Sequence, residues 1–152
     1  MILRVNNQPQ PEITLDNVSL MIDACKGRQE QRDRAILISL LDTGCRASEF
    51  VALNIVSVNL MTGTVTIRHG KGDKSRTTFL GKAAYKPFVP QGRPREKIWL
   101  ISRKELRRYL KARTGLTATS PVWATNDYER LTRSGLWQIL RRRYIDVEIP
   151  EP

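Results

Sequence analysis

The stretch that decides the fold runs from Leu40 to Arg76 and holds two polar motifs. The first follows an apolar run with helical spacing and reads Thr43-Gly44-Cys45-Arg46-Ala47-Ser48-Glu49-Phe50. The second separates two runs with the alternation of β-strands and reads His69-Gly70-Lys71-Gly72-Asp73-Lys74-Ser75-Arg76. Gly44 is expected to end the helix, and the glycines on either side of Lys71 permit a tight hairpin turn. Arg46 and Lys71 are 25 positions apart, which leaves room for a short helix, a turn and two short strands.

Helices are predicted on both sides of this stretch from apolar spacing and capping residues. Thr14 is a candidate N-cap for a first helix, which ends near Gly27. A second helix over 30–43 is apolar on most sides and is expected to be the central core helix, with a wetter start at Asp33. A short third helix is predicted over 47–53. Two later helices cover 102–113 and 132–146, the last with Thr132 as N-cap.

Between the helices, three runs read as strands over 56–60, 64–69 and 76–80. Apolar and polar residues alternate in the second run, which is the period of a half-buried strand. The sequence therefore predicts an α+β fold, mainly α-helical, with a small three-stranded antiparallel sheet that carries Lys71 at one edge. Residues 14–152 form one domain, and residues 1–13 read as a flexible lead-in. Residues 81–100 read as an inserted, extended basic loop, because three prolines within eight positions disfavour a helix.

Charge narrows the class of partner. The chain carries a net charge of +11, and residues 66–113 hold fifteen Lys and Arg against three acidic residues. A concentrated basic block is typical of proteins that bind nucleic acid, although a solvated basic face would look the same. No 18-residue apolar run or signal-peptide pattern is present, so a membrane partner is not expected and a cytoplasmic, DNA-associated protein is the default. Cys25 and Cys45 match neither a disulfide framework nor zinc-ligand spacing and are interpreted as buried residues.

The two motifs together resemble those of the tyrosine recombinase (phage integrase) family, in order and in spacing. That family has a Thr-Gly-x-Arg-x-x-Glu-hydrophobe motif followed by a hairpin turn of the form Gly-Lys-Gly-x-Lys-x-Arg. The resemblance covers roughly residues 14–147. It implies site-specific breakage and rejoining of double-stranded DNA through a 3′-phosphotyrosine, without a metal or high-energy cofactor. Members of the family act as a tetramer bound to DNA. For these 152 residues, a monomer or dimer is expected.

The resemblance implies a role for six residues. Arg46 would bind the scissile phosphate, Lys71 would protonate the leaving 5′-oxygen, and Glu49 would brace the site. Lys74 and Arg76 would hold phosphates, and the counterpart of Arg133 reads the major groove in some members. Without the second motif, an Arg46–Glu49 surface pair would be the simpler interpretation. For Arg133, a solvated arginine in the first turn of its helix is the open alternative.

A His-x-x-Arg motif and the nucleophilic tyrosine of the family are not found in these 152 residues. Tyr144 lies on an apolar helical stripe, upstream of where that motif would stand, and is interpreted as a core residue. We therefore expect the chain to be inactive alone: a piece of a longer recombinase, a truncated remnant, or one part of a site completed by a partner. The alternative function is a non-catalytic DNA-binding remnant that keeps the fold. A basic RNA-binding protein is a third reading, but it leaves both motifs unexplained.

Overall fold

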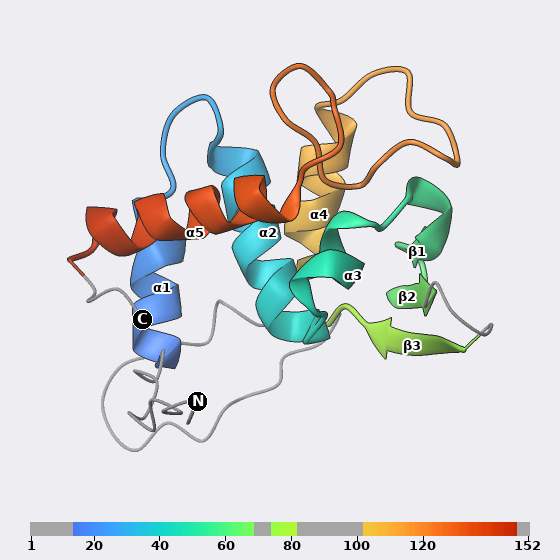
Figure 1. Ribbon diagram of the computed structural model, residues 1–152, viewed down its shortest axis with the longest axis horizontal. Helices are drawn as coiled ribbons and strands as arrows, with labels where there is room; N and C mark the ends of the chain where they lie inside the picture. The colour runs from blue at the N-terminus through green and yellow to red at the C-terminus, as the bar shows by residue number, and fades with distance from the viewer. Residues whose placement is uncertain (1–13, 69–73, 82–101, 149–152) are drawn as a thin grey trace, which may run out of the picture.

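The computed structural model describes residues 14–68, 74–81 and 102–148. Five α-helices and a three-stranded sheet are described in these ranges, with the helices forming the bulk and the sheet at one side (Figure 1). Their order along the chain is α1 (Leu15–Ala24), α2 (Glu30–Thr43), α3 (Ala47–Val51), η1 (Ile55–Ser57), β1 (Val58–Asn59), β2 (Thr64–Arg68), β3 (Ser75–Phe79), α4 (Ser102–Lys111) and α5 (Arg133–Asp146). This is the mainly helical α+β fold that the sequence predicts.

Helix α2 is the centre of the structure. Its Ala35 and Ile36 are fully buried, α4 packs along it, and α1 packs against both α2 and α5. The main core cluster also includes a stack of three aromatic rings, in which Trp123 lies between Phe50 and Tyr109 at centroid distances of 4.7 and 5.8 Å. This core holds α2 rigidly, so the backbone that follows its C-terminal end is fixed in position.

The sheet is antiparallel with the order β1–β2–β3, so β2 is central. Val58 pairs with Val65, and Thr66 pairs with Thr77. Val65 and Ile67 face the core, whereas most of β3 is exposed. The hydroxyl of Thr78 donates to the Thr43 carbonyl at 3.0 Å, which attaches the outer strand to the end of α2. The sheet is thereby fixed beside the Gly44–Arg46 turn.

Two predicted elements are shorter than expected, for one reason. The predicted strand 56–60 is reduced to β1, and the predicted helix 47–53 ends at Val51. Ile55 and Val56 donate their N–H groups to the carbonyls of Ser120 and Ala118, and Val122 N–H bonds to Leu53. The 51–57 segment therefore pairs with a distant loop rather than continuing the helix or the sheet, and local sequence does not reveal that loop.

The prediction that α2 begins with a solvent-exposed turn at Asp33 is wrong. Asp33 is fully buried, and its two carboxylate oxygens bind Arg32 Nε at 3.0 Å and Arg143 Nη2 at 2.6 Å. A buried carboxylate is stable only when it is paired in this way. Asp33 thus joins α2 to α5 instead of facing solvent.

The predicted helix boundaries are otherwise close. Thr14 and Thr132 both act as N-caps, accepting from the N–H groups of Asn17 and Gly135. Gly44 ends α2 with φ +61, in the left-handed region that favours glycine. Helix α4 ends at Lys111 rather than Arg113.

The lead-in 1–13 and nearly all of the insertion 81–100 lie outside the described residues. The two described residues that flank 82–101 are brought together, since Asp42 Oδ2 accepts from the Gly81 N–H at 2.5 Å and from the Ser102 hydroxyl at 2.7 Å. In the part of the chain that the structure describes, no helix is long and apolar enough to cross a membrane.

Candidate functional site

Arg46 stands at the point where the core helix gives way to α3. Cys45 before it and Phe50 after it are buried, and the Arg46 carbonyl accepts the Phe50 N–H at 2.9 Å. Arg46 is the N-cap residue of α3, with an extended backbone. Its side chain is 78% exposed. The backbone is therefore rigid while the guanidinium faces outward, which suits an arginine that binds an external phosphate.

Glu49 holds this turn in place. Its side chain is only 7% exposed, and Oε2 accepts the Arg46 N–H at 2.9 Å. A carboxylate in the first turn of a helix also interacts favourably with the free N–H groups there. The Arg46 guanidinium itself lies 3.7 Å from Glu49 Oε1. Glu49 thus fixes mainly the Arg46 backbone and leaves its side chain available.

Arg76 approaches the same carboxylate from β3. Arg76 Nη2 donates to Glu49 Oε2 at 2.7 Å, and the Arg76 side chain is 41% exposed. The contact joins the first motif to the last residue of the second motif, across 27 positions of sequence. Three of the six predicted site residues, Arg46, Glu49 and Arg76, therefore lie together.

The other three predicted residues are placed less closely. Lys74 is exposed just before β3, and Arg133 is exposed as the first residue of α5. Arg46 precedes α3, and Arg133 begins α5. These two helices pack against each other (Figure 1). Lys71, like His69, lies outside the described residues.

Burial argues against Tyr144, Cys25 and Cys45 as nucleophiles. Tyr144 is 4% exposed and packs with α1 and α2 residues, and desolvation raises the pKa of its hydroxyl. Both cysteines are buried free thiols; burial raises the pKa of Cys25 to about 11 and also raises that of Cys45. The interpretation of all three as core residues is confirmed.

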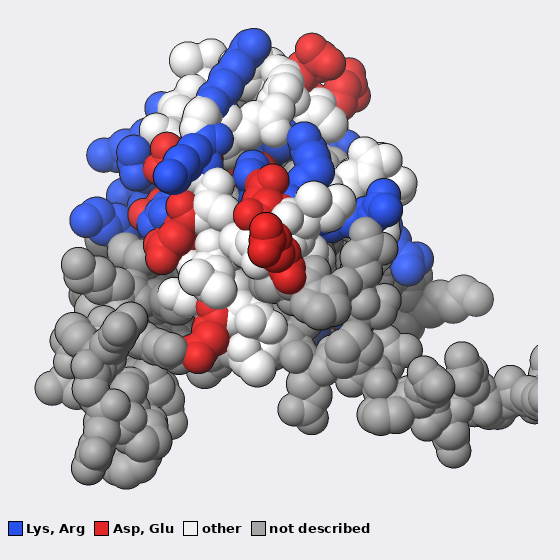
Figure 2. All heavy atoms as spheres, turned by 90° about the vertical axis from the view of Figure 1, so that its left-hand side faces the viewer, with Lys and Arg blue, Asp and Glu red and all other residues white. Residues whose placement is uncertain are grey.

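Part of the basic block is used inside the molecule. Arg103 donates to the carbonyls of Leu80, Met61 and Thr62 at 2.6–3.1 Å, so it fixes the turn between β1 and β2. Arg113 donates to two carbonyls of the 121–122 segment. On the face that Figure 2 shows, Lys and Arg side chains are interleaved with Asp and Glu. Arg103 and Arg113 of the basic block therefore also fix backbone segments of the fold.

The model of the phage integrase family matches residues 11–150. The chain belongs to this family. Among curated tyrosine recombinases, XerC of Pelobacter propionicus is 32% identical over 109 residues, which are 72% of this chain and 30% of XerC. XerA of Pyrococcus furiosus is 30% identical over 130 residues, which are 85% of this chain and 39% of XerA. The chain thus spans well under half the length of these relatives.

Solved structures agree on the fold of this phage integrase family member. A crystal structure of XerA recombinase superimposes with a TM-score of 0.74 at 23% identity, covering 95% of this chain and 46% of the XerA chain. XerH site-specific recombinase, bound to a palindromic difH substrate in a post-cleavage complex, gives a TM-score of 0.63 at 17% identity, covering 91% and 36%. The predicted fold, including the small sheet, is confirmed.

The sequence does not predict the contact between Glu49 and Arg76. Both residues belong to recognisable motifs, but no pattern indicates that the arginine of one motif bonds the acid of the other. The Gly-x-Lys-x-Arg end of the hairpin is a signal only for a basic turn. The pairing follows from how β3 lies against the end of α2, which is a property of the tertiary fold.

Proposed function

We propose that this chain is the DNA-binding portion of a site-specific tyrosine recombinase, which breaks and rejoins double-stranded DNA through a 3′-phosphotyrosine intermediate. The observation that carries the proposal is Arg46, an exposed guanidinium on a backbone fixed by buried Glu49 at the end of the core helix. The family membership and the DNA complexes of the XerH relative support the same reaction class.

In this proposal Arg46 binds a non-bridging oxygen of the scissile phosphate. Negative charge collects on these oxygens in the transition state, and fixed positive donors stabilise it most effectively when they need no reorganisation. Glu49 contributes by holding the Arg46 backbone rather than by contacting DNA. Lys71 is assigned as the general acid for the leaving 5′-oxygen, on the basis of the hairpin motif alone.

The DNA backbone is proposed to run past Lys74, Arg76 and Arg133. Lys74 and Arg133 are exposed cations. Arg76 already shares the Glu49 carboxylate, so its other, solvent-facing N–H groups would be the ones that reach a phosphate. These contacts would supply affinity and position but no base recognition, except at Arg133, which we propose enters a groove.

The nucleophile and the remaining transition-state donors are not among these 152 residues. In the proposal they come from a further segment, in cis or in a partner chain. Without a nucleophile the covalent pathway does not exist, so this chain alone binds DNA without cleaving it. The competing function is a non-catalytic DNA-binding remnant that keeps the recombinase fold.

Covalent trapping on a library of nicked duplexes tests the proposal. The 152-residue chain is compared with a chimera that continues into the part of Pyrococcus XerA that follows the matched region. We expect a protein–DNA adduct only from the chimera, lost in Arg46→Ala and retained at lower yield in Lys74→Ala. An adduct from the 152-residue chain would contradict the assignment of Tyr144 to the core. Duplex binding that survives loss of both Arg46 and Lys71, with no adduct from the chimera, would favour the non-catalytic function.

A further inference from the structure

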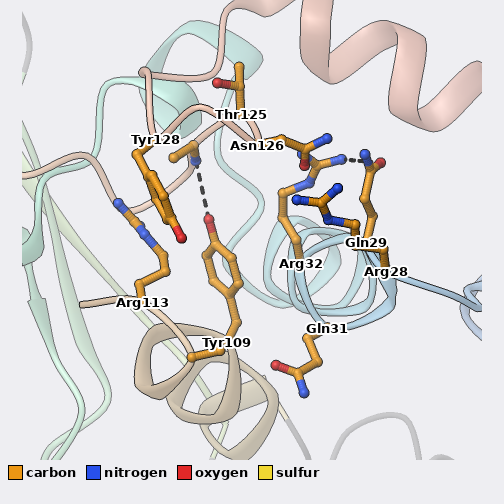
Figure 3. Close-up of a pocket in the computed structure, with 11 residues that line it drawn as sticks. Arg28, Gln29, Gln31, Arg32, Tyr109, Arg113, Thr125, Asn126 and Tyr128 are labelled. Carbon is orange, nitrogen blue, oxygen red and sulfur yellow. Dashed lines mark hydrogen bonds between the residues drawn. The ribbon is translucent and has the colours of Figure 1, made fainter.

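A pocket lies at the opposite end of α2 from Arg46. It is a pocket of about 160 Å³, formed by the start of α2, the end of α4 and the 124–128 loop (Figure 3). Helix α2 has 14 residues, which at 1.5 Å per residue separates its two ends by about 21 Å. Its lining includes Arg28, Arg32, Tyr109, Arg113, Asn126 and Tyr128.

The pocket wall is basic. Among the residues that the structure describes, three arginines and no acidic residue line it. Arg32 is held rigidly: its guanidinium bonds to Asp33 at 3.0 Å, to Gln29 at 2.7 Å and to Asn126 at 3.4 Å. Asp33 balances the charge of Arg32, so this arginine gives the pocket a fixed shape more than a free charge.

The charge of Arg113 has no such balance. Its guanidinium lies 5.6 Å from the centre of the Tyr109 ring and donates to the neutral carbonyls of Pro121 and Val122. Its Nε is buried without a hydrogen-bond partner. Within the described ranges, neither Arg113 nor exposed Arg28 forms an ion pair with a carboxylate. A partly buried cation without an anion is costly, so the pocket is electrostatically incomplete.

Tyr128 lies at the edge of this pocket in a strained conformation. It has φ +63, which is unfavourable for a side chain of this size, and it is 62% exposed. The turn is fixed by the bond from Tyr128 N–H to the Thr125 carbonyl at 3.1 Å and by that from Thr125 N–H to Glu129 at 2.8 Å. The loop thus holds the Tyr128 ring in solvent beside Arg113 (Figure 3). The ring does not pack in the core, so core packing does not explain the unfavourable backbone conformation.

We infer that this pocket binds a carboxylate side chain of an acidic polypeptide partner. A guanidinium presents a planar fork of donors that matches a carboxylate, and Arg113 and Arg28 supply the uncompensated positive charge. The pocket volume of about 160 Å³ accommodates an Asp or Glu side chain. The Tyr128 ring covers the apolar stem of that side chain.

Recession of the pocket favours a polypeptide over DNA. Tyr109 is 6% exposed, and the Arg32 side chain is 10% exposed. A single flexible side chain can reach such groups, whereas the phosphates of a duplex are carried on a stiff backbone and bind arginines that project outward. The site lies at the end of α2 away from Arg46, so a protein partner bound there would leave Arg46 accessible to DNA.

Chemical-shift titration of the 152-residue chain tests the inference. The probes are a blocked Gly-Glu-Gly peptide, its Gly-Gln-Gly counterpart, inorganic phosphate and a short duplex. We expect the glutamate peptide to shift the amides of Asn126 and Tyr128 in a saturable way, while the glutamine peptide does not. Equal shifts with both peptides, or stronger shifts at these amides with phosphate or duplex, would overturn the assignment to a carboxylate.

Variants separate the pocket from the overall basic charge. Arg28→Gln should weaken binding of the glutamate peptide about threefold, as expected for an exposed charge pair, whereas Arg108→Gln, an exposed α4 residue outside the pocket, should leave it unchanged. Tyr128→Gly should weaken peptide binding while the thermal midpoint stays level or rises, because glycine tolerates a positive φ. Equal losses in Arg28→Gln and Arg108→Gln, or unchanged binding in Tyr128→Gly with a lower midpoint, would refute the site.

Discussion

Two carboxylates, one near each end of α2, hold arginines in opposite ways. Asp33, in the first turn of α2, is fully buried, and the side chains of its two arginines are mostly covered: Arg32 is 10% and Arg143 13% exposed. Glu49, just beyond the other end, is nearly as buried at 7%, yet the side chains of Arg46 and Arg76 are 78% and 41% exposed. The acids are alike, and the arginines differ.

The difference indicates how each cluster is used. At Asp33 the ion pairs join α2 to α5, and every charge is consumed inside the molecule. At Glu49 the acid fixes a backbone N–H and one guanidinium, while the Arg46 guanidinium remains free to bind something outside. Burial of the arginine, more than burial of the acid, therefore separates a structural cluster from a candidate binding site.

Removing the buried acid should have the largest effect. Asp33→Ala leaves the guanidinium groups of Arg32 and Arg143 without their shared partner in a low-dielectric environment. The free energy of unfolding should fall by about 3–5 kcal/mol, measured by urea denaturation.

The matched control removes the other acid that binds Arg143. Asp146 Oδ2 lies 2.8 Å from Arg143 Nη1, but the Asp146 side chain is 45% exposed. Asp146→Ala should therefore cost no more than about 1 kcal/mol. Similar losses in the two variants would mean that burial does not distinguish these pairs.

Removing the acid at the candidate site should have an intermediate effect. Glu49→Ala deletes the acceptor for the Arg46 N–H and the partner of Arg76, and a loss of about 1–3 kcal/mol is expected for a buried hydrogen-bonding group. Glu49→Gln keeps an oxygen that can accept the N–H and should cost less. The measurement is again urea denaturation. If Glu49→Gln were as damaging as Glu49→Ala, the charge opposite Arg76 would matter more than the backbone cap.

How far the sequence predicts the fold depends on how local each signal is. Thr14, Gly44 and Thr132 mark helix ends through their own backbone or side-chain chemistry, and those boundaries are confirmed. The wet interpretation of Asp33 is wrong because its partner Arg143 is 110 residues away. Likewise, the shortened strand β1 depends on bonds to a distant loop.

The same distinction holds for functional residues. Arg46 and Glu49 are three positions apart within one motif, so the sequence alone indicates that they act together. The basic pocket is assembled from segments near 28–32, 109–113 and 124–128, which lie far apart in the sequence. No single segment carries a pattern that predicts it. Arg113, interpreted from sequence only as part of a basic block, is a pocket residue because of tertiary structure.

Removing the exposed arginine should have the smallest effect on stability. In Arg46→Ala the backbone N–H that bonds to Glu49 is retained, and the deleted guanidinium makes only a 3.7 Å contact with that acid. An i,i+3 ion pair of this kind is worth about 0.2–0.5 kcal/mol. Urea denaturation should therefore give a free energy of unfolding within about 0.5 kcal/mol of the unchanged chain.

A small loss of unfolding free energy in Arg46→Ala would distinguish Arg46 from the buried arginines at Asp33. An arginine that a buried acid and a core helix position, but that contributes almost nothing to folding, is positioned for an external ligand. The same Arg46→Ala substitution should remove the covalent adduct of the chimera, so stability and activity separate in one variant. A loss near that of Asp33→Ala would instead make Arg46 a structural residue, and the two ends of α2 would then serve the same purpose.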